Sequence, residues 1–96
     1  MLLEYLHRQK AAIDTMARRY GARRIRVFGS VARGQELPGS DVDFLVDFPP
    51  GYDLFAQRLP LAEALSELTG RKVDLVPEHE LNRHIRQQVL DEAVDL

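Results

Sequence analysis

The stretch that decides the fold covers residues 29–46 and reads GSVARGQELPGSDVDFLV. The alternating run RIRVF (24–28) stands before it and predicts a β-strand that ends at Gly29. The stretch itself closes with an apolar run after Asp43, which predicts a second strand, stopped by the sequence PPG. Between these two strands we expect a brief helix and then a glycine-containing loop.

Apolar spacing farther out predicts three longer helices and one more strand. We expect the helices over residues 2–20, over 53–69 with Asp53 as N-cap and a break at Pro60, and over 79–94; the strand KVDLV covers 72–76. This order of elements indicates an α/β (α+β) fold, in which a small three-stranded mixed sheet is flanked by about four helices. Since a chain of 96 residues holds one core, we expect a single domain over residues 1–96.

The composition excludes several classes of protein. Hydrophobic residues make up 45% and charged residues 29% of the chain, which is typical of a globular domain. The formal net charge of −2 gives no basic excess, so direct binding to nucleic acid is not expected. The absence of cysteine excludes disulfides, thiolate zinc sites and a thiol nucleophile. No apolar run reaches the roughly 20 residues that cross a bilayer, and the N-terminus does not resemble a signal peptide, so we expect a cytoplasmic protein without a membrane segment.

Three aspartates carry the chemistry that the sequence predicts. Asp41 and Asp43 stand two residues apart where the second strand begins, so their side chains project from one face. Carboxylates this close repel each other unless a cation lies between them, and hard oxygen ligands suit Mg²⁺ or Mn²⁺. Asp74 interrupts the third strand and completes a three-carboxylate cluster if the two strands are neighbours. In the alternative interpretation Asp41 caps a turn, Asp43 pairs with an arginine and Asp74 lies at a strand edge. The cluster is favoured, because charged residues inside apolar strands are costly unless they are compensated.

The Gly29–Ser30 pair is a candidate phosphate-binding turn. It ends one strand and begins a helix, where free backbone N–H groups favour an anion, and Ser30 adds a hydroxyl donor. A Gly-Ser turn alone is weak evidence, because most such pairs are turns or caps. Its position eleven residues ahead of Asp41 makes the prediction stronger.

Read together, residues 29–46 fit the pattern Gly-Ser-x-Ala-Arg-Gly, five residues, Ser-Asp-x-Asp-x-x-Val without a departure. This pattern resembles the minimal nucleotidyltransferase family, the small members of the DNA polymerase β-type nucleotidyltransferase superfamily. The later VDLV, which contains Asp74, matches the place of that family's third carboxylate, and the resemblance spans essentially the whole chain. The positions that match the long motif are Gly29, Ser30, Ala32, Arg33, Gly34, Ser40, Asp41, Asp43 and Val46.

The resemblance implies a role for each candidate residue. Gly29 and Ser30 would hold the β- and γ-phosphates of a nucleoside triphosphate such as ATP. Two Mg²⁺ ions, or Mn²⁺, would be held by Asp41 and Asp43, with Asp74 as a third ligand or as the base that receives the acceptor's proton.

Two roles stay open for Arg33, and one is expected for Ser40. Arg33 contacts phosphate or braces the loop by pairing with an aspartate, and we favour bracing. Ser40 is expected to cap the turn and orient Asp41.

The resemblance also implies a partner. Larger relatives carry a second domain that grips the base and presents the acceptor, so we expect a partner chain or a second copy to supply those walls here. Family members are commonly encoded beside a HEPN-domain toxin and act as antitoxins by adding AMP to one of its tyrosines. We therefore expect a Mg²⁺-dependent protein adenylyltransferase. Two alternatives stay open: a non-catalytic antitoxin that inhibits by binding, and a nucleotidyltransferase that modifies a small molecule such as an aminoglycoside.

Overall fold

The structure of the protein is a computed structural model, and it describes residues 2–96. Its helices are α1 (Leu2–Arg8), α2 (Lys10–Arg19), α3 (Gly29–Ala32), α4 (Leu59–Thr69) and α5 (Arg83–Glu92), with a π-helical turn η1 (Leu54–Arg58) and a 3-10 turn η2 (Glu78–Glu80). Its strands are β1 (Arg24–Phe28), β2 (Val42–Asp47), β3 (Val73–Pro77) and β4 (Val94–Asp95). None of the helices within residues 2–96 is long and apolar enough to span a membrane.

The strands form one mixed sheet in the order β3-β2-β1-β4. β2 pairs with β3 in parallel, whereas β1 runs antiparallel to both β2 and β4. The predicted α+β fold with a mixed sheet is confirmed. The end of β1 therefore meets the starts of β2 and β3 at one edge of the sheet.

The predicted strand count was wrong, because the sheet has four strands and not three. The sequence predicts a helix over 79–94, but α5 ends at Glu92 and the chain then pairs with β1, Val94 opposite Val27. Arg24 of β1 holds Asp95 through two hydrogen bonds, of 3.2 and 2.7 Å. This pairing covers an edge of β1 that a three-stranded sheet would leave open.

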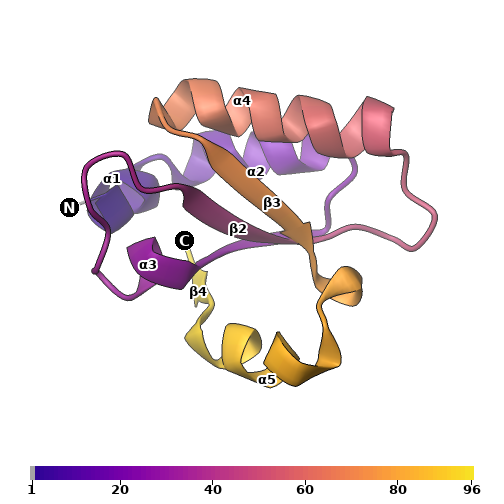
Figure 1. Cartoon of the computed structure of the whole chain (residues 1–96). Coiled ribbons are helices and arrows are strands. Elements are labelled where there is room, and N and C mark those ends of the chain that lie inside the picture. The colour runs from indigo at the N-terminus through magenta and orange to yellow at the C-terminus, as the bar shows by residue number, and fades with distance from the viewer. Residues whose placement is uncertain (1) are drawn as a thin grey trace.

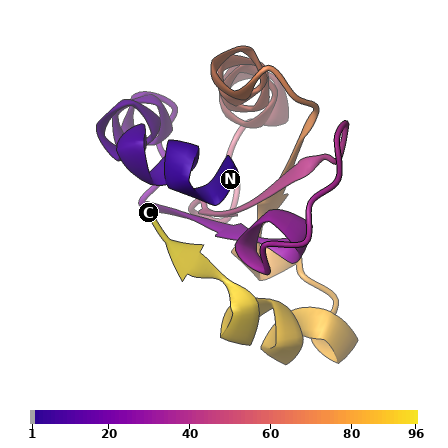
Figure 2. The same cartoon turned by 90° about the vertical axis from the view of Figure 1, so that its left-hand side faces the viewer.

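Helices cover the two faces of the sheet unequally. α2 and α4 lie on one face, and α5 lies on the other, below the sheet in Figure 1 and in the turned view of Figure 2. The apolar core lies between the sheet and the first face, where alternate strand residues point at the helices. Its buried members include Leu6, Ile13, Ile25, Val27, Val42, Phe44, Val46, Leu61 and Leu65. The intervening β2 residues, Asp43 among them, belong to the other face.

The helices begin and end mostly where the sequence predicts. The helix expected over 2–20 is divided at Gln9, and the one expected over 53–69 changes from π-helical to α-helical at Leu59, next to Pro60. The Asp53 side chain accepts the N–H groups of Phe55 and Ala56, as predicted for an N-cap. The cap and the change beside Pro60 are local effects of residue type that the sequence reveals, whereas the division at Gln9 was not predicted.

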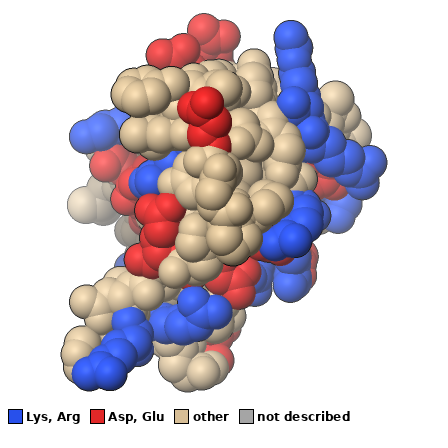
Figure 3. Space-filling model, turned by 90° about the vertical axis from the view of Figure 1, so that its right-hand side faces the viewer, with Lys and Arg blue, Asp and Glu red and all other residues tan. Residues whose placement is uncertain are grey.

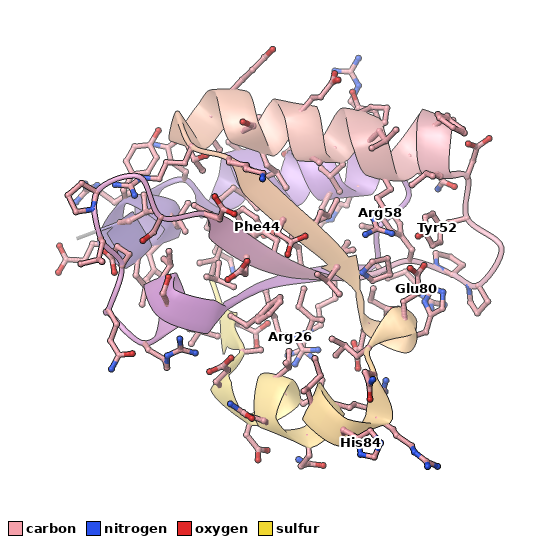
Figure 4. The ribbon with its side chains drawn as sticks, viewed as in Figure 1. Arg26, Phe44, Tyr52, Arg58, Glu80 and His84 are labelled. Carbon is pink, nitrogen blue, oxygen red and sulfur yellow. The ribbon has the colours of Figure 1, made fainter. Side chains whose placement is uncertain are left out.

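Two arginine pairs hold the segment after β3 against the rest of the molecule. Arg26 is buried between the sheet and α5 and donates to Glu78 at 3.1 Å. Arg58 donates to Glu80 at 3.2 Å and to the Tyr52 hydroxyl at 3.1 Å, so the three labelled side chains gather at one end of the sheet in Figure 4. The start of α5 is therefore anchored independently of its end.

Charged side chains of both signs are interspersed over the surface. On the face shown in Figure 3, red and blue groups stand side by side across a mainly tan surface. Several are ion pairs between segments, such as Arg23 with Asp47 at 3.1 Å. This agrees with the small net charge of −2.

Candidate active site

The register of the sheet places two of the predicted aspartates side by side. Asp43 of β2 is the direct partner of Asp74 in the parallel strand β3, so both side chains belong to the same face. Asp41 comes one residue before β2 and is exposed. The structure thus gathers at one edge of the sheet the carboxylates that the sequence singled out.

The pKa of Asp43 reflects the neighbouring carboxylates. Burial is the largest cause that raises the pKa of Asp43 above its ordinary value, and the negative charges of Asp74 and Asp41 raise it further. Arg33 acts in the opposite direction, and Glu92 adds a fourth negative charge nearby. Within residues 2–96, the three aspartate side chains accept no hydrogen bond and form no ion pair. Such mutual repulsion favours the binding of a cation between the carboxylates.

Gly29 is fitted closely against the carboxylate of Asp43. Its φ of 75° lies in the left-handed region, which residues other than glycine rarely adopt. A Cβ at this position would collide with Oδ2 of Asp43. The turn therefore needs glycine for two reasons, and the half-buried Ser30 follows it in α3.

Arg33 braces the turn, as the sequence analysis favours, but its partner is a glutamate and not an aspartate. Its Nη1 donates to Oε2 of Glu92 at 2.8 Å, and its Nε donates to Gln35 at 3.1 Å. The other oxygen of Glu92 accepts the N–H of Gly29 at 3.3 Å. Sequence reasoning missed Glu92, since it stands about sixty residues from its partners and no motif marks it.

Ser40 caps the turn before Asp41. Its hydroxyl accepts the N–H of Leu37 at 2.8 Å, and its own N–H donates to the Leu37 carbonyl at 2.9 Å. Arg71, which precedes β3, donates to the carbonyl oxygens of both Leu37 and Ser40. Arg71 thus ties the loop that carries Asp41 to the segment that leads to Asp74, another contact that spacing did not reveal.

A family model described as a nucleotidyltransferase domain matches residues 10–96. The chain belongs to this family. The chain is therefore a nucleotidyltransferase by class of enzyme. The match begins in α2 and includes all of the residues described above.

Relatives from archaea share most of the chain. The protein adenylyltransferase MntA of Thermococcus cleftensis is 45% identical over 76 residues, which cover 79% of this chain and 76% of that protein. MJ0435 of Methanocaldococcus jannaschii, whose name assigns it provisionally as a protein adenylyltransferase, is 32% identical over 87 residues, or 91% of this chain and 92% of the relative.

Solved structures agree with this nucleotidyltransferase fold. One, described provisionally as a minimal nucleotidyltransferase, superposes with a TM-score of 0.86 at 45% identity, over 100% of this chain and 97% of the other. Another is a toxin–antitoxin crystal structure with AMP-PNP, which matches with a TM-score of 0.75 at 27% identity over 90% of this chain and 70% of the other.

The donor set fits a divalent cation bound in the manner of a nucleotidyltransferase. Within residues 2–96, no three histidine, aspartate or glutamate side chains form a ready-made metal cage. Magnesium in nucleotide enzymes commonly needs only one or two carboxylates, because phosphate and water oxygens supply the other ligands. Asp43 has the required chemistry, since its carboxylate is unpaired and repelled by its neighbours.

Proposed function

We propose that this chain is a Mg²⁺-dependent protein adenylyltransferase that moves AMP from ATP to a tyrosine hydroxyl of a partner HEPN toxin. It would act as the antitoxin of that pair, in the cytoplasm and within a complex of the two chains. The observation that supports this most is the Asp43–Asp74 register beside Gly29, in a chain 45% identical to a protein adenylyltransferase. The likeness to a toxin–antitoxin structure with AMP-PNP supports the nucleotide and the kind of partner.

The proposed reaction assigns a task to each part of the site. Gly29 and Ser30 would hold the β- and γ-phosphates, with the Ser30 hydroxyl as a donor, because Glu92 already accepts the N–H of Gly29. Asp41 and Asp43 hold two Mg²⁺ ions. When bound, these ions stabilise the attacking and leaving oxygens of an in-line displacement.

Asp74 is the proposed acceptor of the transferred proton. The tyrosine oxygen forms a bond to the α-phosphorus while the bond between the α-phosphorus and the bridging oxygen breaks, and pyrophosphate leaves. The phenolic proton passes to Asp74, whose side chain is exposed and free of protein partners within residues 2–96. Asp74 can instead complete the metal ligands, with solvent as the proton acceptor. Variants of Asp74 distinguish the two, because loss of a base changes the pH dependence of transfer, whereas loss of a ligand changes the metal dependence.

Mass spectrometry of the partner tests the proposal. The chain is co-expressed with a candidate HEPN-domain partner, and the purified partner is examined for tyrosines carrying AMP. We expect the modification with the wild-type chain and its loss with Asp43→Asn, while the control Asp47→Asn retains it. A partner that is inhibited equally well by Asp43→Asn and carries no AMP would instead establish inhibition by binding alone.

A further inference from the structure

Glu92 makes two hydrogen bonds to the turn that the proposed function assigns to phosphate. One oxygen accepts the Gly29 N–H at 3.3 Å and the other accepts from Arg33 at 2.8 Å. The Glu92 side chain is 19% exposed, against 45% for Arg33, so the carboxylate lies behind the arginine. One carboxylate therefore holds both the backbone and the cationic side chain of the turn.

The position of Gly29 is critical because it lies against Asp43 on its other side. The turn is fixed from two directions. Glu92 at the end of α5 accepts the Gly29 N–H, and Asp43 lies against the Gly29 Cα. A shift of this turn would move the phosphate-binding groups relative to the aspartates. Small displacements of such groups lower the efficiency of group transfer strongly.

Arg33 remains able to bind an anion while it is held by Glu92. A guanidinium has five N–H donors. Gln35 and Glu92 each use one of them, so three remain. Glu92 therefore orients the Arg33 guanidinium without consuming its capacity to donate.

We propose that Glu92 is a positioning residue for the triphosphate, which holds Gly29 and Arg33 in the arrangement that binds the nucleotide's phosphates. This inference rests on the proposed function, since it concerns the same site. It adds to the site a residue of α5, which lies outside the motif at residues 29–46. It also gives α5 a task in catalysis beyond covering the sheet.

Glu92 is not needed to anchor α5. The start of the helix is held by Arg26 with Glu78, and the strand that follows is held by Arg24 with Asp95 at 2.7 Å. Removal of the Glu92 carboxylate therefore leaves the helix attached at both sides. A change in nucleotide binding can be separated from a loss of folding.

The test measures binding of an ATP analogue that cannot transfer AMP. The α,β-methylene analogue of ATP is titrated with Mg²⁺ into the wild-type chain, Glu92→Gln, Glu92→Ala and the control Asp95→Asn, alone and with the partner. Asp95→Asn weakens another arginine–carboxylate pair only three residues away. We expect the Kd to rise about tenfold in Glu92→Ala and by a smaller factor in Glu92→Gln, which keeps one acceptor, while Asp95→Asn changes it less than about twofold.

Two further measurements separate the possible outcomes. The Gly29 amide signal in NMR spectra without nucleotide is expected to move in Glu92→Gln and to stay in Asp95→Asn, and both variants are expected to keep one cooperative thermal unfolding transition. Wild-type affinity in Glu92→Ala, or tighter binding in Glu92→Gln, would overturn the positioning role and leave the proposed function intact. If the wild-type chain binds no analogue with or without its partner, the proposed function fails, and the inference fails with it.

Discussion

Asp43 of β2 lies directly opposite Asp74 of β3, and on its other side it pairs with Phe28 of β1. Phe28 is the residue before Gly29, so a single row across the sheet joins both carboxylates to the glycine turn. The row exists because β1 is antiparallel to β2 whereas β3 is parallel to it. The mixed topology of the sheet thus creates the site, and the predictions below follow from the contacts in this row.

Removal of the Asp43 carboxylate is expected to abolish most of the transferase activity. Asp43→Asn should lower kcat/KM for AMP transfer by about 10²–10³-fold, because it removes a charged ligand of the proposed metal site. The control Asp47→Asn lies in the same strand and weakens an exposed pair with Arg23, so its activity should stay near wild type. Equal loss in the two variants would show that the effect belongs to the strand and not to the site.

The same substitution is expected to stabilise the protein when no metal is present. Since burial and nearby carboxylates raise the pKa of Asp43 in the folded state, the unfolded chain releases this proton at a lower pH. Stability therefore falls as the pH rises between the ordinary and the raised pKa, and the loss persists at neutral pH. Thermal unfolding in EDTA should give Asp43→Asn a higher Tm than wild type at pH 7.

The difference should depend on pH and on metal. Below the ordinary pKa of an aspartate the two proteins should unfold at similar temperatures, because both carry a neutral group at position 43. Mg²⁺ with a nucleotide should raise the Tm of the wild type more than that of Asp43→Asn. A lower Tm for the variant at pH 7 would contradict the electrostatic account.

Gly29→Ala tests the contact between the turn and Asp43. Gly29 and Gly51 both have a positive φ, of 75° and 85°, so alanine at either position introduces backbone strain of about 1–2 kcal/mol. A Cβ at Gly29 also collides with Asp43, whereas one at Gly51 meets no atom within 4 Å among the described residues. Gly29→Ala should therefore lose about 100-fold in activity, and Gly51→Ala should lose stability alone.

Asp53→Ala is expected to reduce stability without affecting transfer. The Asp53 carboxylate accepts two backbone N–H groups, at 2.8 and 2.9 Å, at the start of the segment that leads into α4. Its loss should lower the free energy of unfolding by about 1 kcal/mol, measured by urea unfolding, and Asp53→Ser should recover much of it. If Asp53→Ser lost as much stability as Asp53→Ala, the loss would not arise from the capping hydrogen bonds.

The sequence reveals the parts of this molecule that depend on local chemistry. Alternation predicts β1, an apolar run stopped by prolines predicts β2, and Asp53 marks a cap. Gly70 ends α4 in the left-handed conformation. The Asp41–Asp43 spacing likewise points to a carboxylate site, because strand geometry fixes the face on which side chains lie. These signals need no knowledge of distant contacts.

The features that the sequence did not reveal depend on residues far apart in the chain. Val94 and Asp95 form a strand only because β1 offers an open edge, and the same residues fit the end of a helix equally well. Glu92 and Arg71 carry no motif, and their importance comes from the distant segments they reach. An arginine is ordinarily exposed, yet pairing with Glu78 allows Arg26 to be buried.

The most direct test of the central claim compares ATP labelled at the α-phosphate with ATP labelled at the γ-phosphate. Each is incubated with Mg²⁺, the purified chain and the proposed HEPN-domain partner, and protein-bound label is measured after electrophoresis. We predict that the partner acquires label from the α-position alone, and that neither Asp43→Asn nor EDTA-treated samples show it. Label from the γ-position, or partner labelling by Asp43→Asn at the wild-type rate, would contradict adenylyl transfer at the carboxylate site.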